Sequence, residues 1–330
     1  MNWVMDHGRF SILAPAKINW TLRVVGKRLD GFHELESLVS PVSLYDELIF
    51  DHFHHQNSAA EGCTPDVEGS GSFEFELQCD EPGIPTDETN LVCRAVRAMV
   101  TAVGQSAGIN MRIRCRLIKR IPAGGGLGGG SSNAAATLMA LNRLWELGWP
   151  KSRLSELAAT LGSDVSLFLD GGPVVMSGRG EKVTPTKLGW HGMNGVNGVD
   201  RAIVLLLPGL HVSTSAVYRA WRPLADPADS GNMNNTKSES ISSVEPRPTA
   251  QAAQWMEQTF NMLETPAIEV CPQLGDLQRR AAEIAGRPVR ISGSGSTMFT
   301  AFDTLEEAQS YGQRIRESLA IRTEVVQPIG

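Results

Sequence analysis

The sequence predicts a protein of the α+β class with two lobes. Its 330 residues are 42% hydrophobic, which supplies apolar side chains for a sizeable core, and domains usually contain roughly 100–200 residues each. In both halves of the chain, stretches with strand periodicity precede stretches with helix periodicity, a pattern typical of α+β architecture. A Gly- and Asn-rich region at 189–200 separates the halves, so we expect an N-terminal domain at residues 1–190 and a C-terminal domain at residues 191–330.

Strand patterns recur along the chain, at 16–24, 44–50, 73–77, 109–117, 174–177, 202–207 and 289–292. In the first of these, apolar and polar residues alternate, which predicts a half-buried strand with Lys17 and Asn19 on one face. A turn centred on Gly31 follows it. The strand at 109–117 carries three arginines on one face, which indicates an antiparallel sheet with one solvent-exposed side.

Helix patterns occupy 91–104, 133–147 and 152–162, and two more follow residue 249. Thr89 or Asn90 can cap the first, and Ser152 can cap the third, which should end at Gly162. Two polar stretches lack any periodicity. We expect a mobile loop at Asp51–Ser72, and a long flexible loop or disordered insertion at 226–249.

Composition limits the classes of partner and compartment. The net charge is −6, and no basic stripe favours nucleic acid, so small molecules are the expected partners. Residues 1–11 have no apolar core typical of a secretion signal, and no apolar run approaches the roughly 18–20 residues that span a bilayer. Five scattered cysteines without a C-x-x-C pair indicate thiols in a reducing cytoplasm. We expect a cytoplasmic protein, monomeric or homodimeric.

A run of glycines is the strongest signal for chemistry. Six of the seven residues from Gly124 to Gly130 are glycine, and Ser131, Ser132 and Asn133 then open a helix. Backbone without side chains can approach a ligand closely, and the N–H groups and dipole of the helix start favour an anion. A mere linker is disfavoured, because so many glycines between a strand and a helix lose much conformational entropy on folding.

Two common phosphate-binding motifs fit this run poorly. A Walker A motif needs Lys directly before Ser131, where the chain has Gly130. The spacing Gly124-x-Gly126-x-x-Gly129 matches the dinucleotide fingerprint, but the preceding strand alternates with arginines, whereas a Rossmann strand is buried on both faces. The Rossmann alternative is disfavoured and stays open.

Several segments together resemble the GHMP small-molecule kinase superfamily. They are Pro15–Asn19, Asp30–Leu35, Pro122–Ala135, Leu161–Val165, Pro208–Gly209 and Ser292–Gly295. Within that superfamily they are most similar to the kinases that act on 4-diphosphocytidyl-2-C-methyl-D-erythritol, a cytidine diphosphate derivative of the non-mevalonate isoprenoid pathway. The resemblance implies an N-terminal lobe like ribosomal protein S5, a ferredoxin-like C-terminal lobe and an active site in the cleft between them.

The resemblance also implies that Lys17 and Asp164 form the catalytic pair. A positioned Asp can accept the proton of a substrate hydroxyl, and a nearby Lys can keep that Asp ionised and offset developing negative charge. Taken alone, Asp164 is better explained as a helix cap after Gly162, and Lys17 as a cation on a solvated strand face; their joint presence in matching segments favours the catalytic roles.

Substrate contacts are implied in the same way. Asn19 is expected to contact the cytidine part, and His33 to read the edge of the base. Phe32 stands where the family tends to have Tyr, and stacking needs only a π face. Tyr218 falls where the family places a second aromatic residue, so we expect cytosine to lie between Phe32 and Tyr218.

ATP and Mg²⁺ are the implied cofactors, although no carboxylate cluster identifies the metal ligands. The expected ATP-binding residues are Asn90, Lys119, Pro122, Ala123, Gly124, Gly125, Gly126, Leu127, Gly128, Gly129, Gly130, Ser131, Ser132, Asn133, Gly293 and Gly295. For two of them, a cap at Asn90 and an exposed side chain at Lys119 are equally good explanations.

The implied reaction is transfer of the γ-phosphate of ATP to the 2-hydroxyl of the cytidylyl substrate. Three alternatives remain at this point. A sister kinase for homoserine, mevalonate or a sugar would lack the Gly31-Phe32-His33 element. A Rossmann oxidoreductase would bind NAD, and an inactive binding protein would tolerate loss of Asp164.

Overall fold

The computed structural model describes residues 1, 3–6, 9–54, 73–104, 111–188, 201–222 and 251–329. The chain divides into two compact units. Unit 1 comprises Met1–Pro15, Tyr45–Ile121 and Gly129–Leu169, and unit 2 comprises Ala16–Leu44, Pro122–Gly128 and Asp170–Gly330. The predicted domain boundary after residue 190 and the predicted loop at 226–249 lie outside the described residues, as does most of the predicted loop at 51–72. Residues 51–54 continue a strand, so the predicted loop begins too early, and only its remainder outside the described residues stays a prediction together with the other two.

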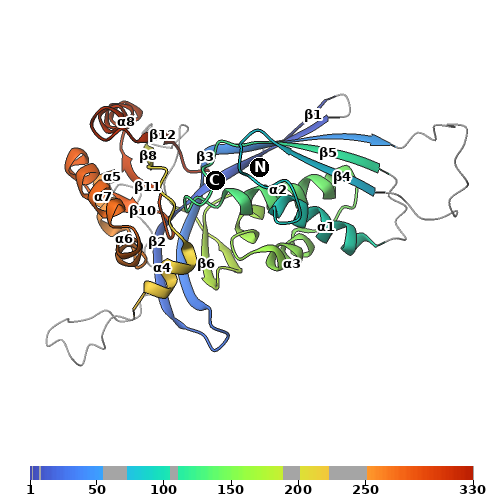
Figure 1. Ribbon diagram of the computed structural model, residues 1–330, viewed down its shortest axis with the longest axis horizontal. Coiled ribbons are helices and arrows are strands. Elements are labelled where there is room, and N and C mark those ends of the chain that lie inside the picture. Colours follow the sequence, from blue (N-terminus) through green and yellow to red (C-terminus); the bar gives the residue numbers. More distant parts are fainter. Residues whose placement is uncertain are drawn as a thin grey trace, which may run out of the picture. The chain divides into compact units, whose positions relative to one another are not determined.

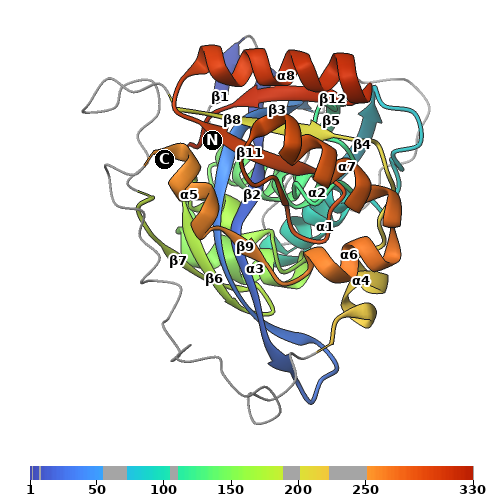
Figure 2. The same cartoon turned by 90° about the vertical axis from the view of Figure 1, so that its left-hand side faces the viewer.

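Figure 1 labels most of the described elements, and Figure 2 adds β7 and β9. One sheet contains β1 (Trp3–Asp6), β2 (Arg9–Lys27), β3 (His33–His54), β4 (Phe73–Cys79), β5 (Met111–Ile118), β6 (Val174–Gly178), β7 (Lys182–Pro185) and β9 (Phe260–Asn261). The other runs in the order β10 (Arg290–Ile291), β11 (Met298–Phe302), β8 (Ala202–Leu207) and β12 (Arg322–Val326). The helices are α1 (Leu91–Val103), α2 (Gly129–Leu144), α3 (Lys151–Leu161), η2 (Ser166–Leu169), α4 (Thr214–Ala220), α5 (Ala252–Gln258), α6 (Glu264–Val270), α7 (Pro272–Ala285) and α8 (Leu305–Leu319).

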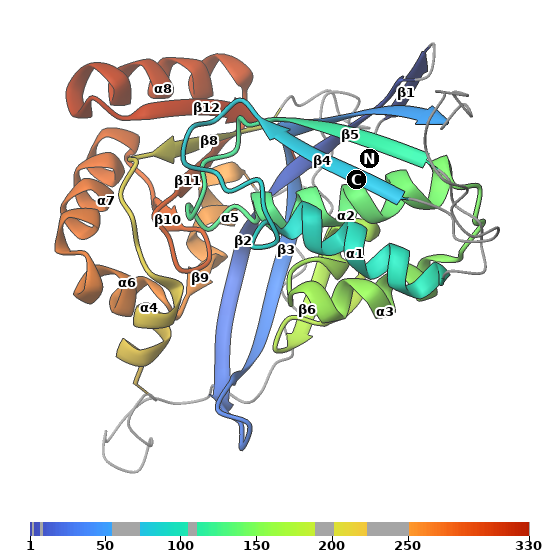
Figure 3. The same ribbon diagram turned by 45° about the vertical axis from the view of Figure 1, so that its right-hand side comes forward.

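Unit 1 packs its helices on a mixed group of strands. β5 pairs antiparallel with the end of β3 and parallel with β4, so the predicted antiparallel pairing is only half correct. The helices α1, α2 and α3 pack together on one side of β4 and β5 (Figure 3). The predicted arginine face is solvent-exposed and carries ion pairs, Arg112–Glu74, Arg114–Glu76 and Arg116–Asp51.

Unit 2 builds its core around β2 and the second sheet. Trp20 of β2 is fully buried, and its ring meets those of Trp255 and Phe299 edge-on, at 5.4 and 5.5 Å between centroids. All residues from Ala16 to Leu22 are buried, so the prediction of a half-buried strand is wrong: both faces of β2 are covered. Figure 2 shows α8 lying along β12, with α7 beside it.

The predicted and observed helix ends agree in some places and differ in others. α1 begins after Asn90, whose side chain caps it, and ends before Gly104, as predicted. α3 ends before Gly162 as predicted, but it starts after Pro150 without a side-chain cap, so the cap predicted at Ser152 is wrong. Three helices, α5 to α7, lie between residue 249 and the predicted strand at 289–292, where two were predicted, and α8 follows that strand.

α2 begins four residues before its predicted start, inside the glycine run, and ends at Leu144. It cannot continue, because Glu146 and Gly148 have positive φ. Within the described part of the chain, no helix is long and apolar enough to cross a membrane. The described cysteines, Cys79, Cys93, Cys115 and Cys271, are free thiols, as predicted.

Candidate functional site

A buried lysine in β2 is the centre of the candidate site in unit 2. The Nζ of Lys17 donates to the Oδ1 of Asn19 at 2.6 Å, and both side chains are buried. Asn19 in turn donates through Nδ2 to the Oγ of Ser37 at 2.8 Å, and that hydroxyl donates to the carbonyl of Thr21 at 2.6 Å. The prediction that Lys17 and Asn19 share a face is confirmed. This relay orients the amide so that its oxygen faces the ammonium.

The second glycine segment, Ser292–Thr297, lies against this pair. A Cβ built on Gly293 would come within 3.3 Å of Asn19 Oδ1 and 3.4 Å of Lys17 Nζ, and the φ of Gly293 is +59°. The segment is a tight turn, in which the N–H of Gly295 donates to the carbonyl of Ser292 at 3.0 Å. Glycine at 293 therefore lets the backbone approach the lysine closely.

The first glycine segment, Pro122–Gly128, is bound to the same two elements. The N–H of Lys17 donates to the carbonyl of Leu127 at 2.9 Å, and the N–H of Thr297 to that of Gly125 at 3.1 Å. Ser292 Oγ donates to the carbonyl of Gly126 at 3.3 Å. A Cβ on Gly126 would lie 2.2 Å from the carbonyl oxygen of Ser292. Glycine is therefore needed at position 126 for the close packing of two backbone segments, whether or not a ligand is bound.

The rest of the glycine run, Gly129 and Gly130, opens α2 in unit 1. Two polar atoms near this helix start, Ser132 Oγ and Asn133 Oδ1, are buried and have no hydrogen-bond partner among the residues that the structure describes. Buried polar atoms without partners are rare. The Ser132 hydroxyl can donate to an anionic ligand or bind its metal, whereas the Asn133 amide oxygen can only accept a hydrogen bond or bind a cation. Sequence analysis identified both residues, but not that they are unsatisfied.

No group of three or more His, Cys, Asp or Glu residues suited to a metal exists among the described residues. In nucleotide sites, Mg²⁺ generally keeps several waters and is held mainly through phosphates and a few protein oxygens. The unsatisfied Ser132 hydroxyl is the protein oxygen that fits such a role.

Two of the predicted ATP-binding residues have structural partners in unit 1. Lys119 is buried, not exposed, and its Nζ pairs with the fully buried Asp46. The other oxygen of Asp46 accepts the backbone N–H groups of Arg120 and Ile121 at 2.8 and 2.9 Å, which fixes the end of β5.

Asn90 caps α1, accepting from Val92 N at 2.9 Å and donating to the carbonyl of Pro85 at 2.6 Å. Binding of ATP by Asn90 and by Lys119 stays a prediction.

An aromatic cluster in unit 2 surrounds His33. The His33 ring stacks on Tyr218, with 5.1 Å between centroids and 26° between planes, and meets Trp221 edge-on at 5.4 Å. Burial lowers the pKa of His33 below 6.5, and nearby Lys27 lowers it further, so the ring is neutral at pH 7. Phe32 is 55% exposed and lies under the Arg179 guanidinium at 5.0 Å.

The described structure thus places His33, rather than Phe32, against Tyr218. The predicted cytosine sandwich between Phe32 and Tyr218 stays a prediction. Sequence analysis missed Trp221, the residue that follows α4. Its position three residues after Tyr218 was the available signal, because residues three apart lie on one helix face.

Asp164 lies in the turn between α3 and η2 of unit 1 and is half-buried. The N–H of Val165 donates to the carbonyl of Gly162 at 3.3 Å across this turn. Lys17 belongs to unit 2, and the catalytic pair of Lys17 and Asp164 stays a prediction.

Comparison with known proteins defines the class. The family model of the GHMP kinases N terminal domain matches residues 90–173, and that of GHMP kinases C terminal matches residues 247–321. A homoserine kinase from Cytophaga hutchinsonii shares the fold, with a TM-score of 0.67, 18% identity and coverage of 100% of this chain and 97% of that one. The protein is a GHMP kinase of the α+β fold class, as predicted, and the Rossmann alternative is excluded.

Proteins of higher sequence identity identify the family within the GHMP kinases. A crystal structure of a 4-(cytidine 5'-diphospho)-2C-methyl-D-erythritol kinase matches with a TM-score of 0.67 and 31% identity over 97% of this chain and 99% of that one. A 4-diphosphocytidyl-2-C-methyl-D-erythritol kinase from Pelotomaculum thermopropionicum is 34% identical over 93% of both chains. One from Dehalococcoides mccartyi is 36% identical over 88% of both. The chain belongs to the 4-diphosphocytidyl-2-C-methyl-D-erythritol kinase family and is an enzyme of the kinase class.

Proposed function

We propose that this enzyme transfers the γ-phosphate of ATP to the 2-hydroxyl of 4-diphosphocytidyl-2-C-methyl-D-erythritol, giving the 2-phosphate and ADP. The observation that carries the proposal is the buried Lys17 ammonium, which lies against Gly293 in a chain related along most of its length to kinases of that name. We assign the reaction to the cytoplasmic non-mevalonate pathway of isoprenoid synthesis, with a monomer or homodimer as the active form.

In the proposed reaction, the oxygen of the substrate 2-hydroxyl attacks the γ-phosphorus. The bond between that phosphorus and the oxygen bridging to the β-phosphate breaks, ADP leaves, and Asp164 accepts the hydroxyl proton. Lys17 offsets negative charge on the transferring group, and a preorganised cation in a buried place does so effectively, since little reorganisation is needed. Mg²⁺, when bound with ATP, would neutralise phosphate charge, and Ser132 is the residue that would hold it.

Asn19 is best supported as the residue that orients Lys17. Its amide oxygen accepts from Lys17, and its amide nitrogen donates to Ser37, so both ends of the group are engaged. A direct contact between Asn19 and the cytidine part would have to use the second N–H or the second lone pair of the amide, since one of each is already engaged. We therefore propose positioning of Lys17 as its main role.

His33 is proposed to read cytosine through its neutral ring. A neutral imidazole offers one donor and one acceptor nitrogen, which matches the mixed donors and acceptors on the edge of cytosine. Tyr218 and Trp221 hold the ring in place. Phe32, exposed and close to this cluster in sequence, is proposed to supply a stacking face.

The test is ADP release by the parent and by Asp164→Asn and Lys17→Met. Four acceptors are offered: the cytidylyl substrate, homoserine, mevalonate and a hexose. We expect release by the parent with the cytidylyl substrate only, and a loss of about 10²–10⁴-fold in kcat for Asp164→Asn, the range of general-base catalysis. Circular dichroism confirms that both variants are folded. If the parent releases no ADP with the cytidylyl substrate, the proposed function is wrong.

A further inference from the structure

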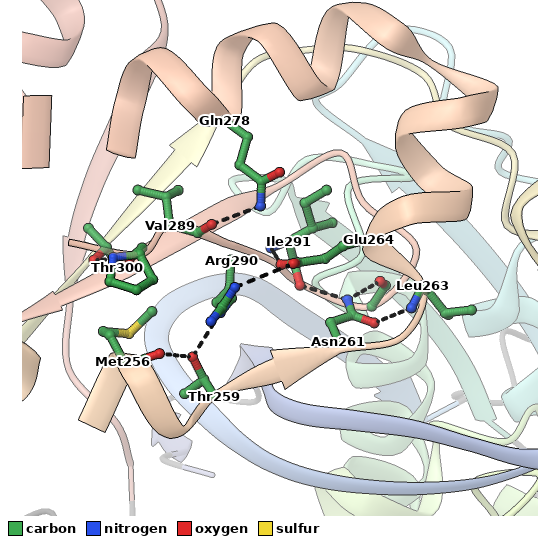
Figure 4. Close-up of polar contacts among 12 residues, drawn as sticks. Met256, Thr259, Asn261, Leu263, Glu264, Gln278, Val289, Arg290, Ile291 and Thr300 are labelled. Carbon is green, nitrogen blue, oxygen red and sulfur yellow. Dashed lines mark hydrogen bonds and ion pairs between the residues drawn. The ribbon is translucent and has the colours of Figure 1, made fainter. Parts of the chain in front are cut away.

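Asn261 is a buried amide in unit 2 that no step of the proposed reaction uses. It lies in β9, a two-residue strand that pairs parallel with β2 through Leu22. Its Nδ2 donates to the carbonyl of Ile291 at 2.8 Å and to that of Gly293 at 2.7 Å. Its Oδ1 accepts the N–H of Leu263 at 2.9 Å. Figure 4 shows this amide reaching from β9 to the start of the second glycine segment.

Other side chains in Figure 4 hold the strand just before that segment. The Oε1 of Glu264 accepts the N–H of Ile291 at 2.8 Å, and Gln278 donates to the carbonyl of Val289 at 2.8 Å. Arg290 donates to the Oγ1 of Thr259 at 3.2 Å. These contacts end at Ile291. Asn261 reaches one step further, because its Nδ2 also donates to the carbonyl of Gly293.

Gly293 is the point where this support meets the candidate site. Its backbone lies against Lys17 Nζ and Asn19 Oδ1, and the residue before it, Ser292, bonds the carbonyl of Gly126. The position of the Gly293 carbonyl therefore determines how closely the second glycine segment approaches Lys17. The first glycine segment is bound to the same turn, so it would move with it.

We propose that Asn261 is a positioning residue for phosphoryl transfer, which fixes the Gly293 carbonyl and thereby holds both glycine segments in register with Lys17. The inference rests on the proposed function and adds a residue to it. Asn suits the place because its amide presents two N–H donors to two carbonyls, while its oxygen serves the Leu263 N–H. Aspartate has almost the same shape but would direct an oxygen at both carbonyls.

The test compares Asn261→Asp with the parent enzyme in the ADP-release assay, after both are normalised to their folded fraction by circular dichroism. We expect kcat to fall by about 10- to 100-fold, since small displacements of positioning groups have effects of that order. The KM for the cytidylyl substrate should change little. Thr259→Val is the matched control, because Thr259 is buried two residues earlier and bonds Arg290 and Met256 rather than the glycine segment. It should lower Tm and leave kcat per folded enzyme unchanged.

If Asn261→Asp does not fold, a second variant and a second measurement still test the inference. Asn261→Ser keeps a small polar group but cannot reach both carbonyls. Amide hydrogen exchange of peptides covering residues 292–297 should be faster in Asn261→Ser than in the parent and in Thr259→Val. Unchanged exchange, or a kcat for Asn261→Ser within about twofold of the parent, overturns the inference. Inactivity of the parent with the cytidylyl substrate would instead reject the proposed function, and the exchange result would still decide the role of Asn261.

Discussion

Protonation of the His33 ring is expected to weaken binding of the cytidylyl substrate. Its pKa lies below 6.5 because the ring is desolvated and Lys27 is near, so the neutral form persists through neutral pH. As the pH falls through that lowered pKa, the ring gains a proton and loses the acceptor with which it would read cytosine. We expect the KM for the cytidylyl substrate to be constant at neutral pH and to rise at acidic pH.

The measurement is KM against pH for the parent and for His33→Gln. The variant should have a higher KM without the acidic rise, because Gln does not titrate. The same acidic rise in both proteins would show that another group is responsible. The KM for ATP serves as the internal control, and its pH profile should be the same in both proteins.

Glu264 gives a prediction about stability. Its carboxyl side chain is only 15% exposed, and desolvation raises its pKa above the usual 4.5, against the opposing effects of the Ile291 N–H and Arg290. The folded state therefore holds the proton more tightly than the unfolded state. The stabilising contribution is complete below pH 4.5 and is lost as the pH rises through the raised pKa.

Glu264→Gln keeps an acceptor for Ile291 N–H and removes the charge. We expect the variant to be at least as stable as the parent at neutral pH, with the difference in Tm shrinking toward acidic pH. Thermal melts of both proteins between about pH 4 and pH 8 check this. A variant that is less stable at neutral pH than at acidic pH, relative to the parent, would contradict it.

Some of these residue contacts could be predicted from the sequence and others could not. Lys17 and Asn19 are two positions apart in a strand, so their shared face follows from period two. The Asp46–Lys119 pair joins residues 73 positions apart, and no local pattern identifies one as the partner of the other. The same holds for Asn261 and Gly293, which are 32 positions apart.

At the scale of elements, two glycines of the same run should respond oppositely to substitution by alanine: Gly126→Ala should destabilise the protein, and Gly130→Ala should not. Gly126 has φ +77°, and a Cβ there would meet the backbone oxygen of Ser292 at 2.2 Å. Gly126→Ala should therefore destabilise the fold by several kcal/mol, since a left-handed alanine alone costs about 1–3 kcal/mol. Gly130 is exposed within α2, and a Cβ built on it would lie 3.5 Å from Leu91 Cδ1, which is ordinary contact.

Gly130→Ala is the matched control and should be neutral or stabilising by up to about 1 kcal/mol, because Ala favours the helix. Denaturant titration of both variants gives the two free energies of unfolding. Equal effects of the two substitutions would show that the φ and the close approach at Gly126 do not matter.

Asn90 allows a structural role and a binding role to be separated. As the cap of α1 it should contribute about 1 kcal/mol, so Asn90→Ala lowers the free energy of unfolding by that amount. Asn90→Ser retains a capping oxygen and should recover most of the loss. If the residue also binds ATP as predicted, the KM for ATP rises in both variants. An unchanged KM in Asn90→Ser would leave the cap as its only role.

The elements themselves were predicted where local chemistry decides them. The start and end of α1 follow from an Asn cap and a terminal glycine, which act within a single turn. The start of α2 does not follow from local signals, because glycine disfavours a helix. Glycine at position 129 is explained by packing: a Cβ built on it would lie 3.0 Å from Ile121 Cγ2. The burial of both faces of β2 also escaped prediction, because rings distant in the sequence cover it.

At the scale of the whole molecule, the chain does not build its units from consecutive residues. Unit 2 combines Ala16–Leu44 and Pro122–Gly128 with Asp170–Gly330. Inside it, Leu22 and Val24 share one core cluster with Val204 and Phe302. A cut after residue 190, the predicted domain boundary, would therefore divide the core of unit 2 between two fragments.

We accordingly expect the fragment 1–190 not to fold when it is made alone. Trp20 would lose the rings of Trp255 and Phe299, and Leu22 and Val24 would lose their core partners. Exposing each large apolar side chain costs about 1.5–3 kcal/mol, and a few such losses equal the whole stability of a typical domain. The fragment should be insoluble or lack a cooperative thermal transition, whereas co-expression with 191–330 should restore a soluble complex that melts cooperatively. A soluble 1–190 fragment with its own sharp transition would instead mean that residues 16–44 can complete a core without the C-terminal part of unit 2.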